Sequence, residues 1–215
     1  MSPSWFFGFD VILEVMFAVI CLIVALFSFK IYKDTKFRSL KFFGFSFLLI
    51  SLSYMIQSIF NFLIVSEFNQ DVCRIIRVHS IHNFEALGII THMFLMTLGL
   101  SILLYTTLKD KRLRTLWLLI LISFAAVFFS KNNLYMFYLI STIYLAFISW
   151  HYILNHYLTK QNKTLLVAIA FLFLLFGNFH FLISVNHELF YAIGHILELF
   201  AYLFIMLNLY LVRRR

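Results

Sequence analysis

The sequence is poor in the residues that interrupt helices or connect domains. Its 215 residues include one proline and six glycines. Clusters of these residues mark turns, linkers and low-complexity tracts, and the chain has none. Without a linker or a shift in composition there is no point at which to divide it. We therefore expect residues 1–215 to form a single domain.

Charged residues are also scarce. Asp, Glu, Lys and Arg make up 12% of the chain, hydrophobic residues make up 63%, and the mean hydropathy is +0.96. An ordinary soluble domain has roughly 25% charged and 45 to 50% apolar residues. The composition therefore excludes a soluble globular protein and indicates an integral membrane protein. The two cysteines, Cys21 and Cys73, follow no metal-binding spacing.

Long apolar runs occur throughout the sequence. A helix needs about 20 residues to cross the hydrocarbon core of a membrane. The runs are continuously apolar, whereas the strands of a membrane β-barrel alternate, so a barrel is excluded. We predict an all-α bundle of seven transmembrane helices, with a six-helix alternative because the fourth run is short. The runs lie at about 10–29, 42–65, 84–108, 116–130, 134–157, 165–184 and 190–212.

The basic residues predict the orientation of the bundle. Fourteen of the 17 lysines and arginines flank the apolar runs on one side, and only Arg74, Arg77 and Lys131 lie on the other. Because basic residues concentrate in cytoplasmic loops, the N-terminus is predicted outside and the C-terminus in the cytoplasm of a cell membrane. The net charge of +8 then follows from the topology. Anionic lipid headgroups are the expected partners of the basic residues. A nucleic-acid partner would require a basic face on a soluble fold.

Two polar residues stand out in the last apolar run. The segment YAIGHILELFAYLF, residues 191–204, contains His195 and Glu198. A charge at the centre of a spanning helix costs about 2.5 to 3.5 kcal/mol on insertion scales, so partners are expected. Counting about 1.5 Å per residue from the outer boundary places His195 at about 8 Å, and Glu198 and His92 at about 12 Å. His180 comes to about 6 Å on the same scale.

Other polar residues fall in the same outer half, whereas the inner half is mostly Leu, Ile, Phe and hydroxyl residues. We therefore predict an outward-opening polar pocket that binds a ligand. The alternative to a ligand pocket is a hydrogen-bond network that only holds the helices together. Besides His92, His180, His195 and Glu198, the predicted pocket residues are Glu14, Tyr54, Gln57, Asn61 and Glu85.

The pocket suggests two kinds of cofactor. His195 and Glu198, like His82 and Glu85, form a His-x-x-Glu pattern that places both side chains on one helical face. Together with His92 and His180, the pair His195 and Glu198 could bind zinc, iron or copper. A b-type heme held by His92 and His195 is the second option. No lysine lies within a predicted span, which excludes a retinal Schiff base.

A metal-dependent intramembrane hydrolase is the alternative function. Seven-helix enzymes resembling the alkaline ceramidases hold zinc with three histidines, two of them four residues apart on the last helix. Here His187 and His195 are eight residues apart, so that pattern is absent. In this alternative Glu198 or Glu85 would act as general base. A purely structural bundle is the third hypothesis.

The last run carries a resemblance to a known family. The ending GHILELFAYLFIMLNLYLVRRR looks like the last helix of membrane-associated sensor domains in bacterial and archaeal histidine kinases. In those proteins a Gly-His pair opens a helix that leads to a cytoplasmic output. The resemblance implies a sensory or receptor-like role. Because no kinase or cyclase follows Arg215 in this sequence, the signal is expected to pass to a separate cytoplasmic partner.

Overall fold

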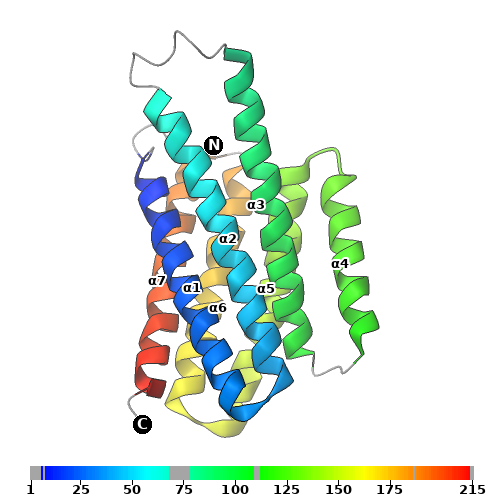
Figure 1. Ribbon diagram of the computed structural model, residues 1–215, viewed down its shortest axis with the longest axis vertical. Helices are drawn as coiled ribbons and strands as arrows, with labels where there is room; N and C mark the ends of the chain where they lie inside the picture. Colours follow the sequence, from blue (N-terminus) through cyan, green and yellow to red (C-terminus); the bar gives the residue numbers. More distant parts are fainter. Residues whose placement is uncertain (1–5, 7, 68–77, 109–111, 186, 214–215) are drawn as a thin grey trace.

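The structure is a computed structural model that describes residues 6, 8–67, 78–108, 112–185 and 187–213. This part of the chain is all-helical, which confirms the predicted fold class at that level. Seven helices follow one another along it (Figure 1): α1 (Phe9–Thr35), α2 (Arg38–Glu67), α3 (Val78–Thr107), α4 (Leu113–Phe128), α5 (Asn133–Thr159), α6 (Asn162–Ser184) and α7 (Leu189–Arg213).

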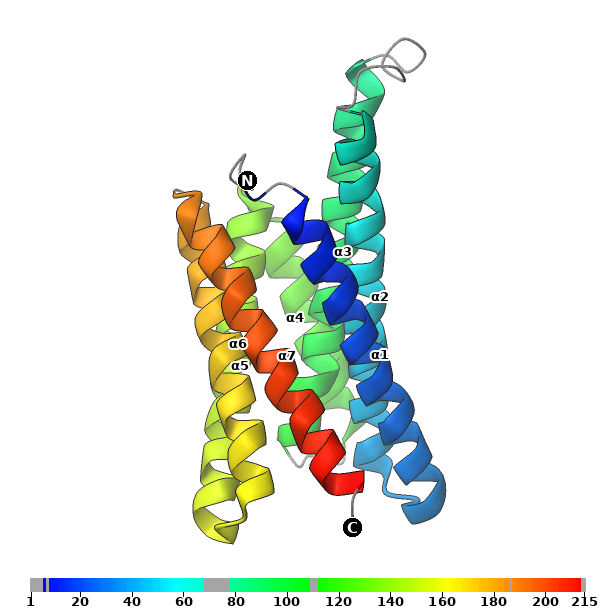
Figure 2. The same ribbon diagram turned by 90° about the vertical axis from the view of Figure 1, so that its left-hand side faces the viewer.

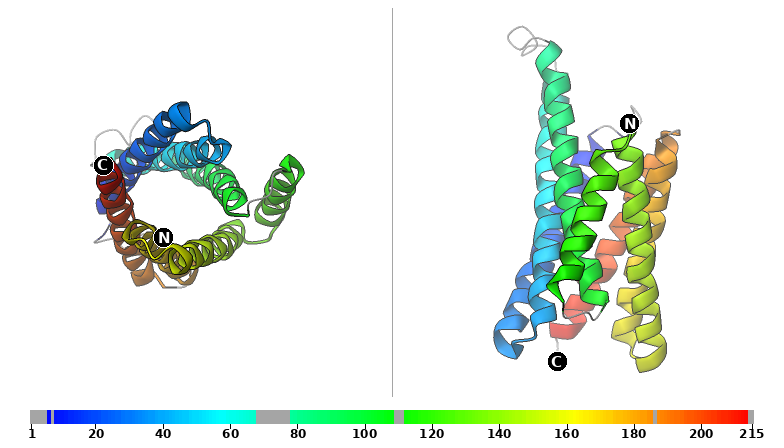
Figure 3. Two further views of the ribbon diagram at one scale, coloured as in Figure 1. Left: turned by 90° about the horizontal axis from the view of Figure 1, so that it is seen from below. Right: turned by 90° about the vertical axis from the view of Figure 1, so that its right-hand side faces the viewer.

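Six of the helices form a closed ring. Around it α1 packs on α2, α2 on α3, α3 on α5, α5 on α6, α6 on α7, and α7 on α1 again. The view along the bundle shows this ring with α4 outside it (Figure 3). Within the described residues α4 packs only on α3 and α5. One of its bonds joins the hydroxyls of Ser123 and Tyr144, which connects α4 to α5.

The six ring helices are long and apolar enough to cross a membrane, and the chain is a helical membrane bundle. Its outward surface fits that environment, since large apolar side chains such as Leu118, Phe147 and Phe200 are exposed there. Helix α4 is shorter, with 16 residues, or a length of about 24 Å at 1.5 Å per residue. Its short apolar run is the reason that the sequence allowed either six or seven spans.

The helix ends alternate between the two ends of the bundle. The start of α1 lies at the same end of the bundle as the end of α6 and the start of α7, while α7 ends at the opposite end (Figures 1 and 2). At that opposite end α1 and α5 each stop at a lysine in the left-handed conformation, Lys36 with φ 57° and Lys160 with φ 52°. A positive charge there complements the helix dipole.

The half of the ring nearer the C-terminus has an apolar core. Hydroxyl side chains within it bond to backbone carbonyls: Ser51 donates to Ala18 of the neighbouring helix at 2.7 Å, and Ser149 donates to Phe171 at 2.9 Å. Such bonds leave no hydroxyl unsatisfied in a region without water. Fully buried residues of this core include Val24, Phe47, Leu103, Leu145, Ile148 and Phe171.

Candidate functional site

Two carboxyl groups lie buried near the start of α1. Asp10 and Glu14 are each only 2% exposed. Asp10 Oδ1 accepts hydrogen bonds from the backbone N–H groups of Gly8, at 2.8 Å, and Val11, at 2.9 Å. An acidic residue in the first turn also complements the helix dipole. Asp10 is therefore held at the end of the helix, one turn from Glu14.

Glu14 is paired with the neighbouring helix α2. Its two carboxyl oxygens accept hydrogen bonds from Asn61 Nδ2, at 2.9 Å and 3.0 Å. Asn61 is half-buried, so the amide and the carboxyl group satisfy one another between the helices. The predicted pocket residues Glu14 and Asn61 thus lie in direct contact.

A second carboxyl group joins α7 to α2. The Tyr54 hydroxyl donates a hydrogen bond of 3.0 Å to Glu198 Oε1, and the Tyr202 hydroxyl donates one of 3.3 Å to Tyr54. All three side chains are buried. The other carboxyl oxygen, Glu198 Oε2, has no hydrogen-bond partner among the described residues. This oxygen is a buried acceptor whose hydrogen-bonding capacity is unused.

His195 lies next to that oxygen inside an aromatic enclosure. The His195 ring stacks with Phe6 and Phe17 at centroid distances of 5.8 and 6.1 Å. The rings of Phe181, at 5.0 Å, and Tyr191, at 4.6 Å, meet it edge-on. Neither ring nitrogen has a hydrogen-bond partner among the described residues. Nδ1 is 3.8 Å from Glu198 Oε2, too far for a hydrogen bond and near enough for an ion pair.

These residues form one connected group between α1, α2 and α7. Glu14 lies close enough to Asp10 and Glu198 to interact with both electrostatically. No lysine or arginine of the described chain pairs with any of the three carboxyl groups. We call the group the polar cluster, and define it as Asp10, Glu14, Tyr54, Asn61, His195, Glu198 and Tyr202.

The remaining pocket candidates are placed differently. Gln57 lies on α2 between Tyr54 and Asn61, half-buried, and its Oε1 has no partner among the described residues. The side chain of Glu85 lies outside the described residues, as does that of His82. The structure thus brings Glu14, Tyr54 and Asn61 together with the α7 pair.

His92 is bonded to α2. Its Nδ1 lies 2.9 Å from Ser53 Oγ, and the Ser53 hydroxyl donates to the His92 carbonyl at 2.9 Å. Its ring meets Tyr54 at 5.7 Å and Phe137 at 5.8 Å. The bonds of His92 therefore join α2 to α3. Phe17 and Tyr54, in ring contact with each other at 5.4 Å, continue the packing towards His195.

His180 bonds within its own helix. Its Nδ1 donates to the Phe176 carbonyl at 2.7 Å, and its ring contacts Phe179 and Phe190. Its neighbour Phe181 is the residue that meets the His195 ring. Consecutive side chains on an α-helix point about 100° apart, which explains why one contacts His195 and the other does not.

The geometry gives little support to a metal centre or a heme. Within the described part of the chain, no three of the His, Cys, Asp and Glu residues come together as ligands of one metal ion, whereas a zinc site uses three or four protein ligands. A heme between His92 and His195 would need a slot for its macrocycle. Tyr54 and Phe17 instead fill the packing between the two imidazoles.

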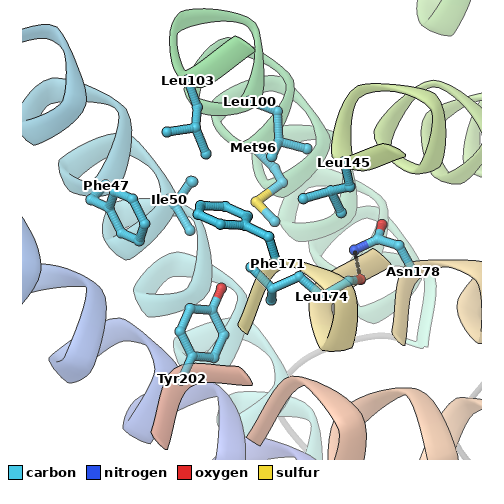
Figure 4. A pocket seen from close by; sticks show the side chains of 10 residues that line it. All are labelled: Phe47, Ile50, Met96, Leu100, Leu103, Leu145, Phe171, Leu174, Asn178 and Tyr202. Carbon is cyan, nitrogen blue, oxygen red and sulfur yellow. Dashed lines mark hydrogen bonds between the residues drawn. The ribbon is translucent and has the colours of Figure 1, made fainter. Parts of the chain in front are cut away.

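A small cavity lies between α2, α3, α5, α6 and α7, and Tyr202 of the polar cluster lines it (Figure 4). Its volume is about 10 Å³, close to the minimum for one water molecule. Tyr202 and Asn178 are its polar residues, and Asn178 Nδ2 donates to the Leu174 carbonyl at 3.5 Å. The other lining residues are Phe47, Ile50, Met96, Leu100, Leu103, Leu145, Phe171 and Leu174.

Sequence reasoning missed Ser53, Tyr202 and Asn178. Tyr202 follows Glu198 by four residues, a spacing that puts both on one face and could have revealed it. Asn178 is buried on α6. The neighbouring Gly177 allows α6 and α7 to approach closely. A Cβ there would lie 3.1 Å from the Gly194 carbonyl oxygen and 3.2 Å from Glu198 Cγ.

Comparisons with known proteins add no relative. No protein-family model, no curated protein and no solved structure matches the chain. The polar cluster and its position in the bundle therefore carry the functional argument.

Proposed function

We propose that the protein is a small receptor-like or sensory protein of the cell membrane whose polar cluster recognises a ligand from the outside. One observation carries the proposal: His195 and Glu198 are buried side by side, and three of their polar atoms have no hydrogen-bond partner in the part of the chain that the structure describes. Ionisable groups inside a membrane are costly and mark functional sites. The other carboxyl groups of the cluster are paired, so the open positions concentrate on α7.

The proposal includes seven spans with the N-terminus outside. It is supported by the alternation of the helix ends along the bundle and by the sequence, in which 14 of the 17 basic residues flank the apolar runs on the side predicted to be cytoplasmic. A reporter fused to the C-terminus should be active only in the cytoplasm. Activity only outside the cell would overturn this orientation.

Helix α7 is suited to carry a signal. His195, Glu198 and Tyr202 follow one another on it at intervals of three and four residues and share one face of α7. The same helix continues to Arg213 at the opposite end of the bundle. A ligand that engages the pair can therefore shift α7 against α1 and α6, in keeping with the resemblance to sensor domains and with a separate cytoplasmic partner.

The test measures the movement of α7 directly. Spin labels would be placed at Leu26→Cys on α1 and Leu203→Cys on α7, both exposed positions, with Cys21 and Cys73 replaced by serine. Distances between the labels would be recorded in lipid nanodiscs. Three probes would be compared: zinc chloride, the small-molecule fraction of the host growth medium, and a shift from pH 8 to pH 5.

At least one probe should change the distance distribution in the parent protein, and His195→Phe should suppress that change. Phenylalanine fits the aromatic enclosure of His195, so the variant removes the nitrogens while preserving the packing. A matched control is His180→Phe, which removes an imidazole that bonds only within its own helix. A distribution that none of the three probes alters would refute the proposed function.

The alternative function, a metal-dependent hydrolase, has less support, since it needs a metal held by at least three ligands and none of the described residues form such a group.

A further inference from the structure

The polar cluster holds three carboxyl groups and a single basic side chain, His195. Of these, Glu14 lies within electrostatic reach of both Asp10 and Glu198, and no described lysine or arginine pairs with any of the three. If all three were ionised, they would repel one another inside a medium that disfavours even one charge. A positively charged ligand would relieve this repulsion.

The packing around the cluster limits the size of that ligand. Four aromatic rings enclose His195, and the cavity that Tyr202 lines has a volume of only about 10 Å³. The Phe17 side chain, which is fully buried, separates His195 from Tyr54 and Tyr202. An organic ammonium ion would have to displace these rings. A proton needs no cavity.

We propose that the ligand of the polar cluster is the proton, taken up from the outer side by the His195 and Glu198 pair. This inference rests on the proposed function and names the ligand of the same site. In the uptake step, hydronium from the outer water transfers one proton, one N–H or O–H bond forms on the pair, and a water molecule is left. The pair changes from one negative charge to none.

The shared proton has a defined place. Nδ1 of His195 and Oε2 of Glu198 face one another at 3.8 Å, and both lack other partners in the described structure. A proton on either atom makes the contact favourable, as a hydrogen bond or as an ion pair, after a small closure. Because the two groups interact, the proton belongs to the pair and not to one residue.

A route from the outer water follows α1. Asp10 lies in the first turn, next to Phe9, which is 63% exposed. Glu14 follows one turn further in and interacts electrostatically with both Asp10 and Glu198. Carboxyl groups spaced by one turn form the kind of acidic chain that serves as a proton relay in membrane proteins.

The route ends in the middle of the bundle. Beyond Glu198 come the hydroxyls of Tyr54 and Tyr202, and then the small cavity, whose other lining residues are almost all apolar. Among the described residues, every buried Asp, Glu and His lies in the polar cluster. The polar cluster is therefore a proton-binding site open to one side of the membrane, as a pH sensor requires, and not a path across the membrane.

The titratable groups around the His195 and Glu198 pair can be named helix by helix. Beside it on α7 are Tyr191 and Tyr202; α1 contributes Asp10, Glu14 and Cys21, α2 Tyr54, α3 His92 and α5 Tyr138. From α6 the described neighbours of the pair are Gly177 and Phe181, which do not titrate. The carboxyl groups and imidazoles in this set are the ones to vary.

The experiment compares the parent protein with Glu198→Gln in nanodiscs. Glutamine keeps the shape of the carboxyl group and cannot take up the proton. Glu188→Gln is the matched control, an exposed acid beside α7 on the same side of the bundle. Two quantities would be measured between pH 8 and pH 5: the melting temperature, and the carbonyl stretching band of protonated carboxyl groups in infrared difference spectra.

As the pH falls, the parent protein should gain melting temperature, because proton uptake removes unpaired negative charge from its interior. The protonated-carboxyl band should change over the same pH range. Glu198→Gln should lose most of the shift and part of the band, while Glu188→Gln should keep both. A parent and a Glu198→Gln variant with the same pH dependence would overturn the inference.

Sodium and folding provide two further arms. A higher melting temperature in sodium chloride than in choline chloride at fixed pH, lost in Glu198→Gln, would assign the site to an alkali cation and reject the proton.

If Glu198→Gln does not fold, Tyr54→Phe keeps the carboxyl group and removes its hydrogen-bond donor. Tyr54→Phe should then displace the pH midpoint, and an unmoved midpoint would contradict the proposal. In the spin-label experiment, a response to zinc or medium but not to pH rejects the proton alone.

Discussion

The Tyr54 hydroxyl is the connection between Glu198 and α2, and its removal gives a quantitative test of the polar cluster. Tyr54→Phe preserves the buried ring and its contacts with Phe17 and His92. It deletes the donor to Glu198 Oε1 and the acceptor for Tyr202. Both carboxyl oxygens of Glu198 would then lack a described partner, because Oε2 already has none.

Two magnitudes bound the effect. Leaving a buried polar group unsatisfied costs about 1 to 3 kcal/mol, whereas interhelical hydrogen bonds inside membranes average about 0.6 and reach about 1.7 kcal/mol. Because one hydroxyl serves two buried partners, we expect a loss of about 1 to 2 kcal/mol, near the upper end of the membrane range. For a chain of this size that lowers the melting temperature by roughly 2 to 8 °C.

The assay is thermal unfolding in nanodiscs at one scan rate and at pH 8. Tyr144→Phe is the control, since Tyr144 is also buried and its hydroxyl bonds to Ser123 and, at 3.3 Å, to the Leu119 carbonyl on α4, away from the polar cluster. Ser123 and Leu119 remain bonded to each other when the Tyr144 hydroxyl is removed. We expect the control to cost less than about 1 kcal/mol. Equal losses in the two variants would show that the polar cluster is ordinary interhelical bonding and would refute the reasoning.

Two further changes probe the same architecture, both by melting temperature in nanodiscs. Asn61→Ala removes the one donor to both oxygens of Glu14, and should cost about 1 to 3 kcal/mol; no loss would mean that the contact is not needed. Gly177→Ala places a methyl group 3.1 Å from the Gly194 carbonyl oxygen and 3.2 Å from Glu198 Cγ. It should cost about 1 to 3 kcal/mol and weaken the pH dependence, and an unchanged protein would contradict the close α6 and α7 packing.

The helical class could be read from the sequence because lipid leaves the backbone little choice. Each segment must satisfy its own backbone hydrogen bonds, so an apolar run of about 20 residues indicates a helix. The expected run at 116–130 is the shortest of the seven, and it corresponds to α4, the helix outside the ring. Which helices close a ring depends on side-chain packing between them, and apolar composition does not encode that order.

Which candidate residues lie together could be predicted only in part, for a similar reason. Depth follows from counting residues, so Glu14, Tyr54, Asn61 and Glu198 could be grouped at similar levels. The rotation of a helix about its own axis, which decides the neighbours that its side chains face, does not follow from such a count. His92 and His180 therefore fit the predicted depth but bond elsewhere, to Ser53 and to the backbone of α6.

The distribution of partners in the polar cluster argues against a purely structural network. In a network that only joins helices, each polar side chain should have a hydrogen-bond partner. Ser51 and Ser149 have one through their hydroxyls, and His92 has one through Nδ1. Replacing a buried ion pair by apolar residues is often neutral or stabilising, so a structural role alone would not require His195 and Glu198. Their polar atoms that have no partner among the described residues lie on one face of α7, between an acidic chain and an aromatic enclosure. That arrangement leaves the positions for a proton open while it fixes everything around them.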